Sequence, residues 1–383
     1  MAVWLEIYCL LLLDMSSTYI PVSVKRDLWF YAHGRCAMCN KPLYRDGLTM
    51  MDVNLSEYAH IIADSPKGPR GDEVLSKELA QDPSNLILLC KDHHKLIDDA
   101  GGVEKFGVEL LRKIKKEHED RIELVTGISP EKKSLVVCYA PKIGDRNPSI
   151  TISETTDTLF PERYPLTPEP IRLDSSNIPY DDNQKKYWEV LPDILTENFR
   201  LKLKDELAKV PHVSVFAMAP QPLLILLGTL IGDLYKVDVW QKHRESQAWK
   251  WLIEGDKNDF IVKRPEDKTK EPVLIFAISG SEITEKVMKQ LGEGYSYWLV
   301  TCENPGRDMM RTKKQLEEFG KLMRDLINEI NESAVGKTLK VFPAMPLSCA
   351  IMFGRVRLPK SDIPWELYDQ PKPHEEYVKT III

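Results

Sequence analysis

Hydrophobic and polar positions follow a helical period near the end of the first third of the chain. From 104 to 125, side chains on one face recur every three or four positions, at Phe106, Leu110, Leu111, Ile114, His118 and Ile122. This spacing predicts an amphipathic helix that buries one stripe. Upstream, the pattern predicts a short helix at 24–33, a β-hairpin that reaches Ile62, and a polar loop. These elements predict a first domain at 15–128.

Prolines interrupt the pattern in the middle of the chain. Nine of them lie between 129 and 192, and proline lacks the backbone N–H that a helix interior uses. We therefore expect a linker and the start of the next domain at 129–192, with irregular structure and one strand at 134–140.

Beyond Pro211, short apolar runs alternate with helical segments. The expected strands are 213–218, 236–240, 273–278, 296–301 and 338–342, and the expected helices are 222–234, 281–290, 312–330 and 347–353. This alternation predicts parallel strands joined by crossover helices. It places an α/β domain at 193–383, with two Rossmann-like halves near 195–260 and 265–383. The whole chain is therefore expected to be α+β.

The first residues carry a short apolar stretch. Residues 2–13 are fewer than the roughly 20 of a membrane span, and they include Glu6. No basic segment precedes them and no small-residue cleavage site follows, so neither a membrane anchor nor a signal peptide is expected. Residues 1–14 are interpreted as an extension from an early start codon. The alternative is a short strand or helix packed on the first domain.

Composition excludes a single small module and a largely disordered chain. The 383 residues are 43% hydrophobic and 29% charged, which are ordinary globular values. The net charge is −6, so a polyanion must be bound through local patches or metal ions. The basic run at 112–116 is either such a patch or a solvated helix face. Seven cysteines are few for this length, which favours a reducing cytoplasm over a disulfide framework.

Two short motifs have the spacing of metal ligands. Cys36 and Cys39 form a CxxC pair, and Cys90 and His93 form a CxxH pair further along the chain. Three thiolates and one imidazole make a closed tetrahedral zinc site. The motifs therefore predict a structural zinc ion that stabilises a small domain.

Three further residues stand inside this frame. His94 follows His93 and would face about 100° away from it on a helix, toward a second metal. His60 ends the strand-like pattern Glu57-Tyr58-Ala59-His60, and Asn85 precedes an apolar run. His60, Asn85 and His94 within the CxxC and CxxH frame resemble the ββα-metal HNH endonuclease motif.

The HNH resemblance implies a role for each of these residues. His60 would be the general base that deprotonates water for attack on a phosphodiester. Asn85 would orient the His60 ring through a hydrogen bond. His94 would bind Mg²⁺ or a similar divalent metal that neutralises the developing charge.

The sequence departs from the HNH pattern at Ala59, where many HNH sequences have an aspartate or histidine that also binds the metal. The candidates to replace that ligand are Glu57, Asp64 and water. The next loop carries Lys67 and Arg70, which either contact DNA phosphates or belong to a plain surface loop. Because nothing resembles a base-reading helix, little sequence specificity is expected.

The second zone resembles a SAVED domain. The segments that carry the resemblance are 213–222, 274–282, 341–354 and the ending 364–369. SAVED domains fuse two Rossmann-like, CARF-like halves and sense cyclic oligonucleotides in bacterial anti-phage (CBASS) signalling. Because ligands of open α/β sheets sit beyond the carboxyl ends of strands, at helix N-termini, the expected ligand-binding residues are Pro220, Gln221, Ser279, Gly280, Ser281, Met345, Trp240 and Lys242. The alternatives are core packing for the tryptophan and helix capping for the serines.

Together the two resemblances imply a cytoplasmic, metal-dependent nuclease that cuts double-stranded DNA when a cyclic di- or oligonucleotide binds. They also imply a homodimer that forms larger assemblies on activation. Two alternatives remain open: a modification-dependent restriction nuclease whose C-terminal domain reads DNA, and a zinc-binding DNA module without catalysis.

Overall fold

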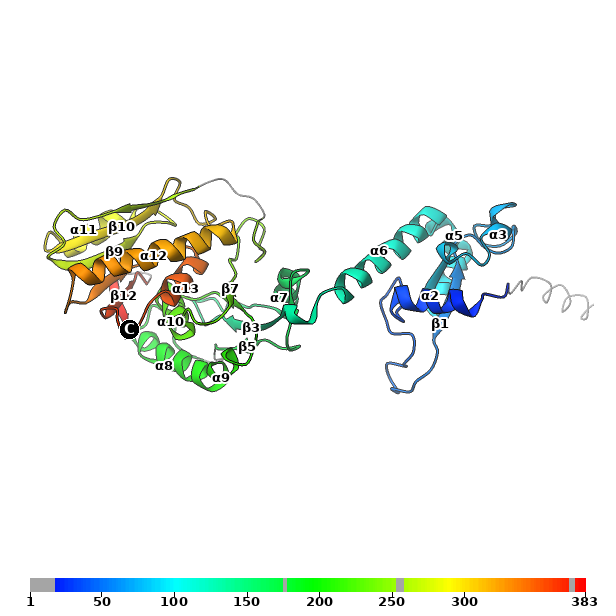
Figure 1. The fold of residues 1–383 in the computed structure, drawn as a ribbon, viewed down its shortest axis with the longest axis horizontal. Coiled ribbons are helices and arrows are strands. Elements are labelled where there is room, and N and C mark those ends of the chain that lie inside the picture. Colours follow the sequence, from blue (N-terminus) through cyan, green and yellow to red (C-terminus); the bar gives the residue numbers. More distant parts are fainter. Residues whose placement is uncertain (1–17, 175–177, 253–257, 372–375) are drawn as a thin grey trace, which may run out of the picture. The chain divides into compact units, whose positions relative to one another are not determined.

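The computed structural model describes residues 18–174, 178–252, 258–371 and 376–383 (Figure 1). The segment 1–14, interpreted above as an extension, lies outside them. The chain divides into two compact units, Met1–Ser129 and Pro130–Ile383. Each is described by itself.

The first unit is a small ββα fold with added helices. Its elements are α2 (Val22–Ala32), β1 (Ser56–His60), α3 (Leu75–Glu78), η1 (Pro83–Asn85), β2 (Leu86–Cys90), α4 (Lys91–Asp98), α5 (Ala100–Lys105) and α6 (Val108–Thr126). β1 and β2 pair antiparallel, with His60 opposite Leu86 and Ser56 opposite Cys90. The core gathers Leu43, Ile61, Leu89 and Leu111 with the buried cysteines.

Two local expectations for this unit differ from the structure. The hairpin expected up to Ile62 forms only in its first part, where Arg45 and Asp52 make an antiparallel bridge and Val53 N donates to the Tyr44 carbonyl at 2.9 Å. The strand ending at His60 pairs instead with β2, beyond the polar loop. The helix expected at 104–125 begins only at Val108. Phe106 adopts φ −106° and ψ 68°, which ends α5 and separates it from α6.

The second unit contains two sheets. The first comprises β3 (Lys133–Tyr139), β4 (Tyr164–Pro165), β5 (Ile171–Arg172), β6 (Val213–Ala217) and β7 (Val237–Val239), all parallel, in the order β4-β3-β6-β7 with β5 also beside β3. The second comprises β8 (Phe260–Lys263), β9 (Glu271–Phe276), β10 (Tyr295–Cys302), β11 (Leu339–Phe342), β12 (Trp365–Asp369) and β13 (Val378–Ile382). Its order is β13-β12-β11-β9-β10-β8, with antiparallel strands only at the two edges.

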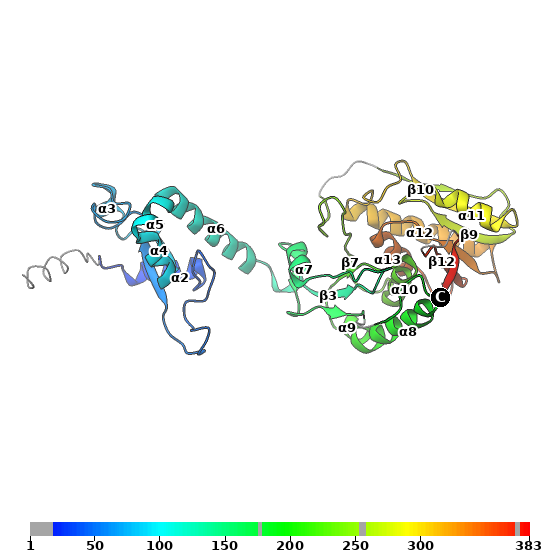
Figure 2. The same ribbon diagram turned by 180° about the vertical axis from the view of Figure 1, so that it is seen from behind.

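The predicted mixed α/β architecture of two Rossmann-like halves is confirmed. The α-helices of the second unit are α7 (Ile152–Leu159), α8 (Lys185–Lys202), α9 (Lys204–Leu207), α10 (Gln221–Ile231), α11 (Ile283–Leu291), α12 (Lys313–Ser333) and α13 (Leu347–Arg355). The first half begins earlier than expected, because the proline-rich segment supplies β3 to β5 and α7. Pro192 lies inside α8, whose apolar face packs beside α10 in the shared core (Figures 1 and 2).

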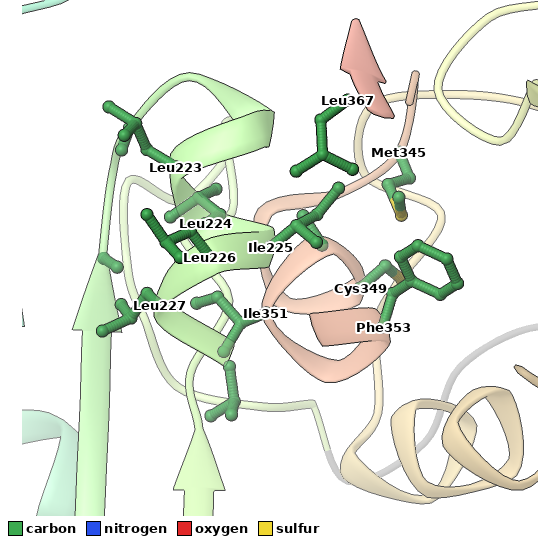
Figure 3. Packing of buried hydrophobic residues seen from close by; sticks show 14 of the residues in the cluster. Leu223, Leu224, Ile225, Leu226, Leu227, Met345, Cys349, Ile351, Phe353 and Leu367 are labelled. Atoms are coloured by element: carbon green, nitrogen blue, oxygen red, sulfur yellow. The ribbon is translucent and has the colours of Figure 1, made fainter. Parts of the chain in front are cut away.

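Helices α10 and α13 pack against each other at the centre of this unit (Figure 3). A Cβ at Gly228 would lie 2.0 Å from the Ile351 carbonyl oxygen, and one at Gly354 would lie 2.0 Å from that of Ile225. Both helices therefore repeat one pattern, an isoleucine followed three residues later by a glycine that permits backbone contact. The two helices are equivalent elements of the two halves.

Within the part of the chain that the structure describes, no helix combines the length and the apolar character that crossing a membrane requires.

Candidate functional site

The Cys₃His motif forms one cluster in the first unit. Cys36 and Cys39 lie in a tight turn after α2, where His33 and Gly34 have positive φ, while Cys90 ends β2 and His93 stands in the first turn of α4. The four ligand atoms lie within 4.8 Å of one another, and His93 Nδ1 is 3.1 Å from Cys90 Sγ. Tetrahedral zinc holds thiolate sulfurs about 3.8 Å apart. The cluster therefore fits the predicted structural zinc.

His94 points away from that cluster toward carboxylates. Its Nε2 lies 3.2 Å from Asp98 Oδ2, and its Nδ1 lies 3.7 Å from Glu57 Oε2. The hydrogen bond to Asp98 raises the pKa of His94. Glu57, one of the candidate replacements for a ligand at position 59, approaches His94 at 3.7 Å. Asp98 was not anticipated, although its i,i+4 spacing from His94 on a helix could have identified it.

Arg70 is placed inside the fold rather than on a DNA-facing surface. Its side chain is 4% exposed and donates to Asp98 Oδ1 at 2.7 Å. It also donates to the backbone oxygens of Ile61 at 2.8 Å and Ile97 at 2.6 Å. Because these acceptors occupy the guanidinium, the structure gives Arg70 a structural role and argues against a direct phosphate contact. Lys67, by contrast, is exposed and stays a predicted DNA contact.

The hydrogen bonds to Arg70 and His94 also set the charge of Asp98. Burial acts to raise the pKa of Asp98, but hydrogen bonds from His94 and Arg70 outweigh it and lower the pKa. The carboxylate is therefore ionised and available to accept from both partners.

His60 is half-buried at the end of β1, and its Nε2 lies 2.9 Å from the Ala80 carbonyl oxygen. Because a carbonyl oxygen can only accept, Nε2 carries the hydrogen in a neutral ring and Nδ1 keeps the free lone pair. The backbone thus selects the tautomer that a general base needs.

Asn85 acts on the loop after His60 and not on the ring. Its side chain is 1% exposed, donates to the oxygens of Ile62 at 2.8 Å and Leu79 at 3.2 Å, and accepts from Ile62 N at 2.9 Å. Both amide hydrogens are therefore used by backbone carbonyls. Instead of the expected hydrogen bond to the His60 ring, Asn85 bonds the backbone of Ile62, two residues after His60. Its effect on His60 is therefore indirect.

Part of the predicted ligand set meets at the carboxyl ends of β6, β9 and β11. Gln221 Nε2 donates to the Met345 carbonyl at 2.9 Å, and Met345 N donates back to Gln221 Oε1 at 3.2 Å. Ser279 N donates to Ala344 O at 2.8 Å, which places the 279–281 loop beside the same strand end. Pro220 caps α10 directly before Gln221.

Trp240 and Lys242 are not part of that group. The Trp240 ring stacks on Phe216 with centroids 5.8 Å apart, and Lys242 Nζ bonds Glu154 of α7 at 2.5 Å. The residue between them, Gln241, turns the other way and accepts from Ser348 N of α13 at 3.0 Å. Successive side chains from Trp240 to Lys242 therefore point alternately to two sides of the chain just after β7. Gln241, on the α13 side, is a residue that the sequence did not single out.

Comparison with known families assigns both units. Residues 36–100 match the family model described as HNH_2, HNH endonuclease, and residues 195–383 match that described as SAVED, SMODS-associated and fused to various effectors sensor domain. No curated protein matched the chain.

Two solved structures are distant matches. The Cap4 SAVED/CARF-domain receptor of Acinetobacter baumannii with the cyclic trinucleotide 2'3'3'-cAAA is 14% identical with a TM-score of 0.39, over 81% of this chain and 66% of that one. The Moraxella osloensis Cap4 receptor is 13% identical with a TM-score of 0.34, over 76% of this chain and 59% of that one. This chain thus spans less than two thirds of their lengths.

The HNH match covers His60, Asn85 and His94 with their hydrogen-bond partners, and the SAVED match covers both groups of predicted ligand residues. An HNH endonuclease domain is a nuclease, and a nuclease is a hydrolase. The protein is a fusion of an HNH endonuclease domain with a SAVED sensor domain.

Proposed function

We propose that this protein is a metal-dependent DNA endonuclease that becomes active when its SAVED domain binds a cyclic oligonucleotide, as an effector of anti-phage (CBASS) signalling in the cytoplasm. The observation that supports it best is the hydrogen bond to the Ala80 carbonyl that fixes the tautomer of His60. The same domain carries His94 beside carboxylates, and the chain also has a sensor domain. Double-stranded DNA is the proposed substrate, with little sequence preference.

His60 is the proposed general base. Its Nδ1 takes a proton from the attacking water while Nε2 stays bonded to the Ala80 carbonyl. That bond stabilises the imidazolium that forms, because the carbonyl oxygen accepts more strongly from a charged donor. Asn85 keeps the strand end in place by bonding the Ile62 backbone on both sides.

His94 and Glu57 are the proposed ligands of the catalytic divalent metal. Their atoms are 3.7 Å apart, a separation that one ion with ligand bonds of about 2.1 Å can bridge. Asp98 accepts from His94 Nε2 and so directs Nδ1 toward the metal position, the usual arrangement of a carboxylate behind a ligating histidine. When bound, Mg²⁺ or a similar ion would neutralise charge that develops on the phosphate and the leaving oxygen.

The sensor site is proposed at the strand ends that Gln221, Ser279 and Met345 share. The exchange of hydrogen bonds between Gln221 and Met345 joins the two halves there, so a ligand that contacts both halves can change their arrangement. Activation is proposed to drive a homodimer into larger assemblies that bring nuclease domains together.

The test is plasmid cleavage with Mg²⁺, with and without cyclic di- and trinucleotides. Wild-type protein is expected to cut only with an activating cyclic nucleotide. His60→Ala should lower cleavage at least about 100-fold, because it removes the base, while leaving nucleotide binding intact. His33→Asn is the matched control, since exposed His33 lies outside the site and asparagine tolerates its positive φ.

Three outcomes would contradict the proposal. Cutting without any cyclic nucleotide, or only of modified DNA, would make the C-terminal domain a DNA reader. Full activity of His60→Ala would remove the base. No cutting with any divalent metal would leave a zinc-binding DNA module.

A further inference from the structure

A cavity of about 320 Å³ lies beside β7, the edge strand of the first sheet, away from the strand-end residues of the proposed sensor site. Its wall includes Lys132, Leu159, Arg163, Trp240, Lys250 and Trp251. Ligand sites in proteins have volumes of about 300–1,000 Å³. The cavity is thus at the small end of that range.

One wall of the cavity is aromatic and rigid. Trp240 is only 8% exposed, and its ring is held nearly parallel to that of Phe216, at an interplanar angle of 12°. Trp251 is half-buried and Leu159 is buried beside it. A fixed apolar wall of this kind suits a planar ring, since nucleobases stack on aromatic side chains regardless of their identity.

The rest of the wall is basic. Lys132, Arg163, Lys250 and Lys313 face two acidic residues, Glu162 and Asp238, so the lining carries an excess of two positive charges (four minus two). This excess favours an anionic ligand.

Arg163 is the cation best placed to change partner. Asp238 lies 2.5 Å from Lys313 Nζ and 3.3 Å from His212 Nε2, but 3.8 Å from Arg163 Nε. The carboxylate is therefore satisfied without Arg163, whose side chain is 25% exposed. A guanidinium in that position can bind phosphate oxygens in a bidentate manner.

We infer that this cavity binds a nucleoside monophosphate, with the base against Trp240 and Trp251 and the phosphate at Arg163 and Lys250. The site is separate from the proposed activator site, because Gln241 faces α13 while Trp240 faces Phe216. Its volume of about 320 Å³ suits a single nucleotide. The inference stands independently of whether a cyclic oligonucleotide activates the nuclease.

Binding there would join the two halves of the sensor. Lys313 is the first residue of α12 in the second half, while Arg163 and Trp240 belong to the first half. The backbone N–H of Leu252 also donates to Arg311 O across the same region, at 3.0 Å. A ligand that binds only the folded arrangement raises the melting temperature of the unit by mass action.

The experiment is calorimetric titration of the full-length protein with AMP, dAMP, adenosine and inorganic phosphate. AMP and dAMP are expected to bind near one equivalent, and more tightly than adenosine or phosphate alone. Trp251→Ala should weaken AMP binding about 5- to 100-fold through lost stacking. Lys250→Ala tests the phosphate contact with little risk to folding, because the exposed Lys250 side chain donates to the Phe160 backbone oxygen.

Lys314→Ala is the matched control, because Lys314 is 84% exposed, next to Lys313, and outside the cavity wall. It should bind AMP like wild type. The inference is overturned if AMP does not bind up to about 1 mM, if phosphate binds as tightly as AMP, or if Lys250→Ala and Trp251→Ala bind normally. It is also overturned if a cyclic oligonucleotide displaces AMP competitively, since the two would then share one site. A cyclic oligonucleotide that fails to activate cleavage would refute the proposed function alone.

Discussion

Arg70 joins the two segments that carry the proposed catalytic histidines. It bonds the Ile61 carbonyl just after His60, and the Ile97 carbonyl and Asp98 carboxylate at the end of the helix that carries His94. A single side chain therefore links the end of the strand that carries the proposed base to the helix that carries the proposed metal ligand. Its φ of 56° is unusual for a residue with a Cβ and is maintained by these contacts.

Arg70→Ala is expected to lower the free energy of unfolding of the first unit by about 2–4 kcal/mol, because it leaves buried acceptors and Asp98 without their donor. Hydrogen exchange of peptides that cover β1 and α4 measures this change. Arg70→Lys should have an intermediate effect on the free energy of unfolding, since lysine keeps the positive charge but lacks the planar guanidinium that bonds several acceptors at once. Lys67→Ala, on the same loop but exposed, should stay within about 0.5 kcal/mol. Equal effects of the two alanine variants would refute the structural role of Arg70.

The sequence predicted the Cys₃His cluster because cysteine and histidine spacing alone carries that information. It proposed His60 and His94 through a motif, and it left the partner of His94 open. Asp98 and the burial of Arg70 were missed because they depend on how the 63–71 loop folds back on α4, which no local pattern encodes. Asn85 was proposed to bond the His60 ring, and the sequence could not show that its side chain bonds backbone groups instead.

At the scale of elements, the approach of α10 to α13 depends on two glycines. A Cβ at Gly228 would meet backbone, at 2.0 Å from Ile351 O and 2.9 Å from Arg355 N. Backbone cannot move aside as a side chain can, so any side chain at this position must separate the helices. The hydrophobic surface in Figure 3 would then lose contact around Ile225 and Ile351.

Gly228→Ala is therefore expected to destabilise the second unit by about 2–3 kcal/mol in chemical denaturation. Gly320→Ala in α12 is the control, since its Cβ would meet the flexible Met352 side chain at 3.1 Å. That cost should be offset by the helix preference of alanine over glycine, about 1 kcal/mol. A loss for Gly320→Ala as large as that for Gly228→Ala would show that helix spacing is not the cause.

Periodicity predicted most elements of the second unit and fewer of its pairings. The strands 213–218, 273–278 and 338–342 were expected and correspond to β6, β9 and β11, because largely buried parallel strands read as mostly apolar runs. The strand expected at 134–140 corresponds to β3, inside the first sheet, whereas the short strands β4 and β5 of the proline-rich segment were not expected. Similarly, β1 pairs with a strand beyond a long loop, so its partner could not be inferred from neighbouring residues.

At the scale of the whole molecule, the two units differ in what stabilises them. The second has an extensive shared core of buried aliphatic and aromatic residues, while the first has a small one in which Cys36 and Cys90 are themselves members. Small domains with thin cores commonly depend on a metal for folding. The stability of the two units should therefore respond differently to zinc.

Removing zinc from the full-length protein with a chelator is expected to lower or abolish the melting transition of the first unit and leave that of the second unchanged, because zinc binding energy is folding energy in such domains. Differential scanning calorimetry measures both transitions. Cys39→Ser should have the same effect without a chelator, since Cys39 is exposed and its replacement removes a ligand with little loss of packing. Metal analysis should show about one zinc per wild-type chain and less in the variant. A chelator that shifts both transitions, or neither, would show that the Cys₃His cluster is not what stabilises the nuclease domain.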